Sequence, residues 1–285
     1  MSETTGRTTV HEPADADALR ETFARLAADD AARPLLVALD FDGTLAPLQD
    51  DPSRSRILPA GVEVLSRLAG ADGLEIALVS GRAMNDLHAL AEVPAGTYLV
   101  GSHGAERARV TRFGLDRDVV QLTDEQADRL AALGAEAAQV ARGRDGVWVE
   151  QKPTAVVVHT RLAPPEVAEP AEAEAVALGE RLGSGVLHGK DVVEISVLKA
   201  SKGEAMAALR GELGAPVVVF AGDDVTDEHA FEVLGEHDVT VKVGDGATRA
   251  RFRVADPDGM VAALAHLADH LADHLADQPA AQPEA

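Results

Sequence analysis

Three short apolar runs constrain the fold of this 285-residue chain more than any other feature. They are PLLVALD (34–40), LEIALVS (74–80) and PVVVFAGDD (216–224), and none of them alternates with polar residues. A strand that is buried on both faces has this pattern, and such strands form parallel sheets covered by helices. Helical patterns separate the runs, as crossover connections require. We therefore expect an α/β fold with a doubly wound, Rossmann-like parallel sheet.

The same rhythm of strands and helices predicts the other elements of this core. The expected helices lie at 14–29, 60–69, 83–91, 202–212 and 226–233, and further strands lie at 97–104 and 239–244. Each strand is short and each helix spans two to four turns, which is typical of βαβ units.

The middle of the chain has a different pattern. Residues 122–143 predict a helix, 146–162 predict two alternating strands around a turn, and 165–183 predict a helix that is interrupted near Pro170. An alternating hairpin is typical of an antiparallel sheet with one open face. We therefore expect a smaller α+β domain inserted into the core. The expected divisions are core at 1–111, insert at 112–188, core again at 189–275 and a disordered tail at 276–285.

Composition narrows the possible partners. The net charge of −22 disfavours binding to nucleic acid or to an anionic membrane surface, although a local basic pocket for a small anion is still possible. The absence of cysteine excludes thiol catalysis and disulfides. No apolar stretch predicts a signal peptide or a membrane span, so we expect a cytoplasmic protein. We also expect a monomer.

Polar residues gather where the predicted strands end. In an open parallel sheet, ligands bind beyond the carboxyl ends of the strands. Any one of these residues alone is more typical of a turn or a helix cap, but the whole set at one edge indicates a site. The set comprises Asp40, Asp42, Gly43 and Thr44 after the first run, Ser80, Gly81 and Arg82 after the second, Asp223, Asp224 and Asp227 after the third, and Lys202 before it.

Two carboxylates separated by one residue, at Asp40 and Asp42, suit phosphoryl transfer. A cluster of carboxylates is tolerable when a divalent cation neutralises it, and hard oxygen ligands favour Mg²⁺. One aspartate can attack phosphorus, while a second protonates the leaving group and then activates water. Gly43 lets the backbone approach a phosphate, and Lys202 supplies positive charge where negative charge accumulates.

The motifs DFDGT, VSGR, SKG and GDDVTDE, in this order, resemble the four motifs of the haloacid-dehalogenase superfamily of aspartyl phosphotransferases. The resemblance implies that Asp40 is the nucleophile and Asp42 the general acid and base. The implied phosphate-binding residues are Gly43, Thr44, Ser80, Gly81, Arg82 and Lys202. The implied Mg²⁺ ligands are Asp40, Asp42 through its backbone carbonyl, Asp223 and Asp224. An aspartate at position 42 is typical of the phosphatases and phosphomutases of that superfamily.

Further segments resemble the trehalose-6-phosphate phosphatase family, in which an inserted cap domain binds the sugar. These segments are VGSHGAE (100–106), VEQKPTAVVVHTR (149–161), GKDVVEI (189–195) and GDDVTDEHAF (222–231). The resemblance implies Mg²⁺-dependent hydrolysis of trehalose 6-phosphate. The implied substrate-binding residues are His103, Glu150, Lys152, Arg161, Lys190 and Glu194, with Gln151 and His159 as weaker candidates. Thr160 stands where the family often has an aromatic residue.

Other interpretations stay open at this point. The substrate could be a hexose phosphate or sucrose phosphate, or the chain could be a phosphomutase or a non-catalytic sugar-phosphate sensor. The polar residues of the hairpin could also form ordinary cross-strand ion pairs on a solvated face. We expect Trp148, the only tryptophan, to pack within the protein rather than to stack on a ligand.

Overall fold

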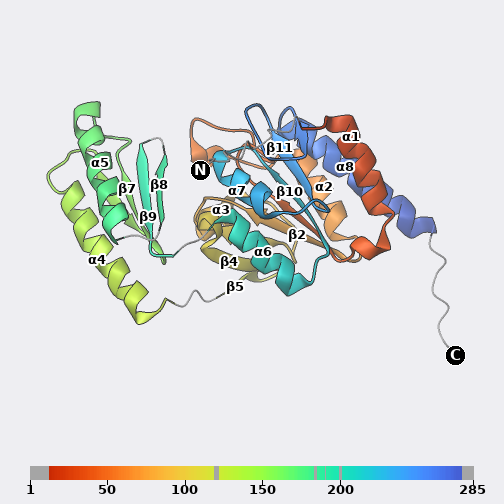
Figure 1. Cartoon of the computed structure of the whole chain (residues 1–285), viewed down its shortest axis with the longest axis horizontal. Coiled ribbons are helices and arrows are strands. Elements are labelled where there is room, and N and C mark those ends of the chain that lie inside the picture. Colours follow the sequence, from red (N-terminus) through yellow and green to blue (C-terminus); the bar gives the residue numbers. More distant parts are fainter. Residues whose placement is uncertain (1–12, 119–121, 183–184, 190, 199–200, 278–285) are drawn as a thin grey trace, which may run out of the picture. The chain divides into compact units, whose positions relative to one another are not determined.

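The computed structural model describes residues 13–118, 122–182, 185–189, 191–198 and 201–277, and Figure 1 labels most of their helices and strands. The α-helices are α1 (Ala16–Ala27), α2 (Pro59–Ala69), α3 (Met84–Leu90), α4 (Asp124–Ala141), α5 (Pro165–Leu182), α6 (Lys202–Leu213), α7 (Val225–Val233) and α8 (Pro257–Asp277). The strands are β1 (Leu35–Leu39), β2 (Leu74–Val79), β3 (Tyr98–Gly101), β4 (Glu106–Thr111), β5 (Gly114–Arg117), β6 (Trp148–Gln151), β7 (Ala155–His159), β8 (Gly185–Gly189), β9 (Val192–Ser196), β10 (Val217–Gly222), β11 (Val239–Val243) and β12 (Phe252–Val254).

An eight-stranded sheet forms the larger part of the fold, in the order β12-β11-β10-β1-β2-β3-β4-β5. The six strands from β12 to β3 are parallel, whereas β4 and β5 add antiparallel at one edge. All five residues of β1 are buried, which agrees with the central position of this strand between β10 and β2. This mostly parallel sheet confirms the expected α/β core.

Helices cover both faces of this sheet, as the non-alternating strands predict. Leu35, Val37 and Leu39 of β1 point to one face, where they join a core built with α1, α2 and α8. Leu36 and Ala38 point to the other face, where residues of α6 and α7 cover them. Burial on both sides explains why β1 contains no polar residue. It also places the carboxyl end of β1 deep inside the protein.

A second, antiparallel sheet belongs to the insert, with the order β6-β7-β9-β8. Val156 and Val158 of β7 and Val193 and Ile195 of β9 pack against residues of α4 and α5. The alternate residues of these strands face away from the two helices. One face of this sheet therefore carries no helix of the described insert.

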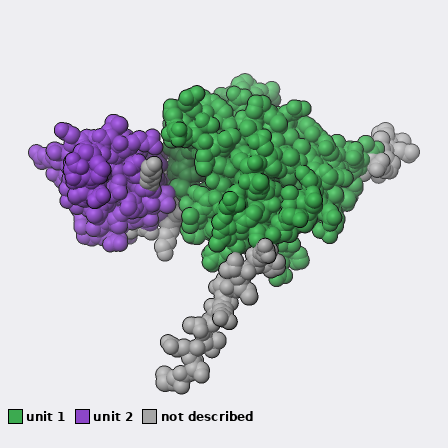
Figure 2. Space-filling view, turned by 90° about the horizontal axis from the view of Figure 1, so that it is seen from above, with its two compact units in different colours: residues 1–117, 201–285 green, residues 118–200 purple. Residues whose placement is uncertain are grey.

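The chain divides into two compact units, which Figure 2 colours separately. Unit 1 comprises residues 1–117 and 201–285, and unit 2 comprises residues 118–200. These limits differ from the expected insert of 112–188 because β5 pairs with β4 in unit 1, while β9 pairs with β7 in unit 2. Sequence patterns cannot show which distant strand a short segment will join.

The helices α5 and α8 both differ from the sequence-based expectations. The interruption near Pro170 is wrong, because α5 runs from Pro165 to Leu182 with the proline inside it. Pro170 lies in the second turn, where the missing amide removes a single helical hydrogen bond. The expected tail of 276–285 lies outside the described residues except for its first two, which end α8 at Asp277. No helix among the described residues is long and apolar enough to cross a membrane.

Candidate active site

The acidic residues predicted from the sequence meet where β1 and β10 end side by side. Asp40 follows β1 directly, and Asp223 follows β10, which pairs with β1 in parallel. Lys202 begins α6 and Asp227 lies in the first turn of α7. Four separate elements of unit 1 thus bring charged side chains to one edge of the sheet.

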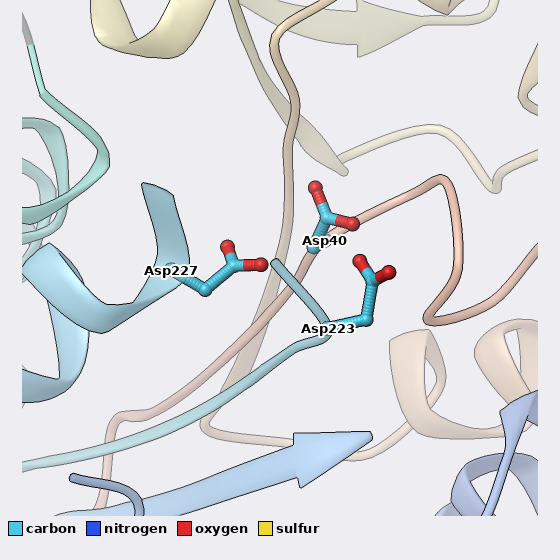
Figure 3. Close-up of side chains that lie close together, drawn as sticks. All are labelled: Asp40, Asp223 and Asp227. Carbon is cyan, nitrogen blue, oxygen red and sulfur yellow. The ribbon is translucent and has the colours of Figure 1, made fainter. Parts of the chain in front are cut away.

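Lys202 links two of these carboxylates. Its Nζ donates to Asp40 Oδ1 at 2.6 Å and to Asp227 Oδ1 at 2.8 Å, and all three side chains are buried. Oxygen atoms of Asp40, Asp223 and Asp227 lie within 4.8 Å of one another. Figure 3 shows these three carboxyl groups pointing toward a common point. Three carboxylates around one point have the donor set and spacing of a site for a hard divalent cation.

The charges at this edge are not balanced by the lysine. Burial raises the pKa of Asp40 to about 7, with Asp223 and Asp224 adding to the rise and Lys202 opposing it. Burial raises the pKa of Asp227 to about 8, and the charge of Asp40 adds to this effect. Burial likewise raises the pKa of Asp223 to about 6, helped by the charges of Asp227 and Asp224. The same burial and repulsion that make these carboxyl groups retain protons also favour a bound cation, which would neutralise the carboxylates in place of the protons.

Lys202 itself remains charged. Burial alone would lower the pKa of its ammonium group, but the charges of Asp40 and Asp227 outweigh that effect and raise the pKa above its ordinary value. The lysine therefore supplies a fixed positive charge beside the oxygen atom that is expected to attack phosphorus.

A second buried lysine, which belongs to none of the motifs identified in the sequence, supports the cluster. Lys242 of β11 donates from Nζ to the backbone carbonyl of Asp223. Its side chain is about 5% exposed, although it stands in the apolar strand VTVKV. A lone charged residue in an otherwise buried strand was the signal that could have identified it.

Asp224 and Asp227 both lie at this edge of the sheet, but their carboxylates have different partners. The carboxylate of Asp224 caps α7 by accepting from the backbone amides of Thr226 and Asp227, with Thr226 N at 2.8 Å. Burial favours a raised pKa for Asp224, but Lys202 and the cap hydrogen bonds together lower it. Asp227 instead of Asp224 completes the group with Asp40 and Asp223.

Glycines make the close approach of these segments possible. Gly43 has φ of +78°, and a Cβ atom built there would lie 2.1 Å from Asp223 Oδ2. A Cβ atom on Gly222 would lie 2.1 Å from Cγ of Asp227. Any larger residue at either position would displace a carboxylate of the cluster.

The expected phosphate-binding hydroxyls are buried beside the nucleophile segment. The Oγ1 atom of Thr44 has no hydrogen-bond partner among the described residues, and the residue is fully buried. Ser80, 2% exposed, accepts a hydrogen bond from the backbone amide of Arg82 at 3.2 Å. A buried hydroxyl without a partner is costly, so the position of Thr44 suits a ligand oxygen.

Arg82, which the family resemblance implies as a phosphate-binding residue, contacts Asp42 in this structure. Its Nε donates to Asp42 Oδ2 at 2.5 Å and its Nη2 donates to Asp42 Oδ1 at 2.7 Å. Asp42 is partly exposed and lies outside the carboxylate group of Asp40, Asp223 and Asp227. The arrangement separates the two aspartates of the DFDGT motif into two different environments.

His103 lies in a strained loop of unit 1. Ser102 and His103 both have positive φ values, of 48° and 55°. Glu106 supports the loop, because its Oε1 accepts from Ser102 Oγ at 2.6 Å and from the backbone amide of Met84 at 3.2 Å. A Cβ atom on Gly81 would lie 2.4 Å from the His103 ring, so this histidine packs on the segment that carries Ser80.

Several of the residues expected to bind the sugar belong to the unit 2 sheet, where they divide between its two faces. Lys152 Nζ donates to Glu194 Oε2 at 2.7 Å, and Nε2 of His159 lies 3.0 Å from Glu150 Oε2. Glu150 and Glu194 are both paired with Val157, so they share one face. Gln151 points to the opposite face.

The other residues of the expected sugar site have different surroundings. A Cβ atom on Gly134 of α4 would lie 2.3 Å from the Gln151 amide nitrogen, which places Gln151 against that helix. Arg161 is exposed in the turn after β7. Lys190 lies outside the described residues.

Comparisons with known proteins agree with this geometry. The family model for trehalose-phosphatase matches residues 38–276. The trehalose-6-phosphate phosphatase of Escherichia coli is 37% identical over 227 residues, which are 76% of this chain and 80% of that protein. The bifunctional trehalose-6-phosphate synthase/phosphatase of Thermoproteus tenax is 36% identical over 263 residues. That match covers 90% of this chain but 34% of the Thermoproteus protein, so the chain spans about a third of its length.

The C-terminal domain of trehalose-6-phosphate phosphatase from C. albicans has the same fold. Its structure matches with a TM-score of 0.69 and 20% identity, and it covers 91% of this chain and 99% of that one. At this identity the likeness concerns the fold alone. From the family model and the relatives above 30% identity, the chain belongs to the trehalose-phosphatase family.

Proposed function

We propose that this chain is a Mg²⁺-dependent phosphatase that hydrolyses trehalose 6-phosphate to trehalose and phosphate. The observation that carries the proposal is the buried contact of Lys202 with Asp40, next to Asp223 and Asp227. An ion pair of this kind fixes a carboxylate nucleophile at the edge of the sheet and provides positive charge for a phosphate beside it.

In the first half-reaction, an oxygen of Asp40 attacks phosphorus in line with the leaving sugar oxygen. The new bond joins the carboxylate oxygen to phosphorus, and the bond between phosphorus and the sugar oxygen breaks. Asp42 gives a proton to the departing oxygen. Lys202 and the hydroxyls of Thr44 and Ser80 stabilise the charge on the equatorial phosphate oxygens.

In the second half-reaction, Asp42 takes a proton from water, and the water oxygen attacks the phosphorus of the aspartyl phosphate. Phosphate leaves, and the carboxylate of Asp40 is restored. Asp42 therefore needs an orientation that serves both proton transfers, and the pair with Arg82 fixes this orientation while the carboxylate is charged.

The carboxylate group fits a divalent cation. Asp40, Asp223 and Asp227 would hold it, and the backbone carbonyl of Asp42 is a further candidate ligand. The raised pKa values of the three carboxyl groups support this assignment, because such groups gain most when a cation neutralises them. Bound Mg²⁺ would neutralise the repulsion between the carboxylates and the substrate phosphate.

We propose that unit 2 binds the sugar. Glu150, Lys152 and Glu194 share the face of its sheet that carries no helix among the described residues. Fixed carboxylates and an ammonium group suit the hydroxyls of a disaccharide. Arg161, His103 and Lys190 are further candidates from the family resemblance, whereas the side chain of Gln151 lies against α4.

Phosphate release from a small panel of substrates tests the proposal. The panel contains trehalose 6-phosphate, sucrose 6-phosphate, glucose 6-phosphate and p-nitrophenyl phosphate, each with Mg²⁺ and with EDTA. We expect a strong preference for trehalose 6-phosphate that depends on Mg²⁺. The Asp40→Asn variant is the control for contaminating phosphatase, since it should release no phosphate.

Each alternative has its own outcome in this panel. Comparable activity on all four compounds would remove the disaccharide specificity and keep the aspartyl-phosphatase chemistry. Tight binding of trehalose 6-phosphate without release would favour a sensor, and a requirement for a bisphosphate activator would favour a mutase. Size-exclusion chromatography with light scattering tests the separate prediction of a monomer.

A further inference from the structure

An exposed tryptophan stands on the same sheet face as the expected sugar ligands. Trp148 and Glu150 are two residues apart on β6, so their side chains point to the same side. The residue is 40% exposed, although it is the largest apolar side chain in unit 2. Its neighbour Val149 points the other way and packs toward the core of this unit.

The ring of Trp148 is fixed on one side. His159 stands directly opposite on β7, and the two rings stack with centroids 4.7 Å apart and an angle of 9° between their planes. Nε2 of His159 lies 3.0 Å from Glu150 Oε2, so the histidine is itself oriented by a carboxylate. One face of the indole is therefore covered by His159. The other face points away from β7, past β6, which is the edge strand of the sheet.

The expectation that Trp148 only packs within the protein does not account for this position. A tryptophan ring buries much apolar surface when it packs in a core, and here a large part of it remains accessible to water. Its orientation is fixed before any ligand arrives, which reduces the entropy lost on binding. A flat apolar surface beside a carboxylate has the chemistry that a pyranose ring requires. The C–H groups of the sugar can contact the ring, and its hydroxyls can bond to neighbouring polar groups.

We propose that Trp148 is a stacking platform for a pyranose ring of the substrate and thus determines specificity for a disaccharide phosphate. The proposal rests on the proposed function, because it assigns a binding role within the same reaction. His159 is a positioning residue in this arrangement, since it supports the indole from behind. Glu150 lies next along the strand and is placed to accept hydrogen bonds from the hydroxyls of the stacked sugar.

Fluorescence gives a direct test because Trp148 is the only tryptophan of the chain. Tryptophan-selective excitation of the full chain therefore reports this ring alone. We expect trehalose, and trehalose 6-phosphate added to the Asp40→Asn variant, to change the emission in a saturable manner. Inorganic phosphate should leave the emission unchanged. No change of emission with trehalose 6-phosphate, at concentrations that saturate turnover by the wild-type chain, would overturn the proposal.

The kinetics of three variants at position 148 distinguish a requirement for a flat aromatic ring from a requirement for a large apolar side chain. Trp148→Phe keeps a flat ring and should retain kcat/KM for trehalose 6-phosphate within about threefold. Trp148→Leu and Trp148→Ala should raise KM for this substrate about tenfold and leave p-nitrophenyl phosphate hydrolysis unchanged. Leu162→Ala is the matched control, since Leu162 is an exposed apolar residue of unit 2 that is 74% accessible and lies outside the sheet. It should change neither substrate.

The outcomes distinguish this proposal from the proposed function. If the wild-type chain hydrolyses trehalose 6-phosphate and Trp148→Leu has an unchanged KM, the platform is overturned and the phosphatase stands. If the chain hydrolyses no trehalose 6-phosphate but trehalose still changes the emission, the proposed function fails and the platform stands. If Trp148→Ala does not fold, Trp148→Leu and Trp148→Phe still decide between stacking and packing.

Discussion

The guanidinium of Arg82 binds the carboxylate of Asp42 through two parallel hydrogen bonds, at 2.5 and 2.7 Å. Its Nη2 also donates to the carbonyl of Pro52 at 2.9 Å and to the hydroxyl of Ser55 at 3.0 Å. The arginine is thus fixed by the segment between β1 and α2, and it fixes the proposed acid and base in turn. A bidentate pair of this kind sets direction as well as distance.

Arg82→Lys should therefore reduce catalysis while keeping the positive charge. A lysine cannot make the fork, so Asp42 would lose its orientation. We expect kcat for trehalose 6-phosphate to fall about tenfold or more, because a sugar alkoxide needs a well-placed acid. The fall should be smaller for p-nitrophenyl phosphate, whose leaving group needs little protonation. In an Asp42→Asn background the arginine change should have almost no further effect. Additive effects of the two changes would contradict a positioning role for Arg82.

Asp227 and Asp224 are close in sequence but should respond differently to removal of charge. Asp227→Asn removes a partner of Lys202 and a carboxylate of the cluster, so we expect an apparent loss of Mg²⁺ affinity on the order of 100-fold. Asp224→Asn retains a side chain that caps helices well, and it should keep Mg²⁺ affinity within a few-fold. The measurement is phosphate release against Mg²⁺ concentration for both variants. Equal losses would restore Asp224 as a ligand.

In the absence of metal, the stability of unit 1 should fall as the pH rises from about 5 to about 8. The folded pKa values of Asp40, Asp223 and Asp227 are about 7, 6 and 8, all above the ordinary value of 3.8. The folded state therefore retains protons that the unfolded state has lost, and this contribution to stability disappears as each folded pKa is passed. Lys202 stays charged throughout this range because its own pKa is raised.

Thermal melts in EDTA at several pH values measure this effect. The melting temperature should decrease toward pH 8 in EDTA, and added Mg²⁺ should raise it more at pH 8 than at pH 5, since metal and protons compete for the same oxygens. Asp227→Asn should flatten the dependence, because it removes the group with the highest folded pKa of the three. A melting temperature in EDTA that is constant or rises over this range would contradict the raised pKa values.

The centre of the fold could be predicted from the sequence because strands buried on both faces appear there as uninterrupted apolar runs. β1 has no polar residue, since both of its faces are covered by helices, and the aspartate that follows it lies where parallel strands end. Short, half-exposed strands contain no such apolar run. β9 joins the sheet of unit 2 only through its pairing with β7, and nothing within Val192–Ser196 specifies that partner. This is why the expected limit at residue 188 differs from the one at residue 200.

The same distinction applies to the site. The spacing of DFDGT determines which aspartate follows the strand, so Asp40 could be placed correctly by sequence. Which anion an arginine binds depends on distances across the fold, so the partner of Arg82 could not be read from its motif. The family resemblance implies both Glu150 and Gln151 as sugar ligands, but neighbours in a strand point to opposite faces. The alternation of side chains along a strand is sufficient to predict that Glu150 and Gln151 lie on different faces of the sheet.

Gly43→Ala should be more harmful than the same change at a glycine with equal backbone strain. Gly43 and Gly244 both have φ of +78°, but only the Cβ atom at position 43 would meet another group, at 2.1 Å from Asp223 Oδ2. We expect Gly244→Ala to lose about 1 kcal/mol of stability and to keep its activity. Gly43→Ala should lose stability similarly or more and also lose most of its phosphatase activity. Thermal melts and phosphate release on the two variants measure both effects, and equal retention of activity would argue against a tight fit between this loop and Asp223.

Lys152→Ala tests whether the ion pair with Glu194 serves the substrate or only the sheet. The two side chains are 2.7 Å apart and 10% and 15% exposed, so removing one leaves a partly buried charge without its partner. If the pair binds sugar hydroxyls, KM for trehalose 6-phosphate should rise about tenfold, while p-nitrophenyl phosphate is hydrolysed at the normal rate. The matched control is Arg144→Ala, which breaks the ion pair with Glu174 on the helical side of the same unit. The control should alter the melting temperature without changing KM for either substrate. A Lys152→Ala variant that behaves like this control would assign the pair to the stability of the sheet and leave Glu150 as the test of sugar binding.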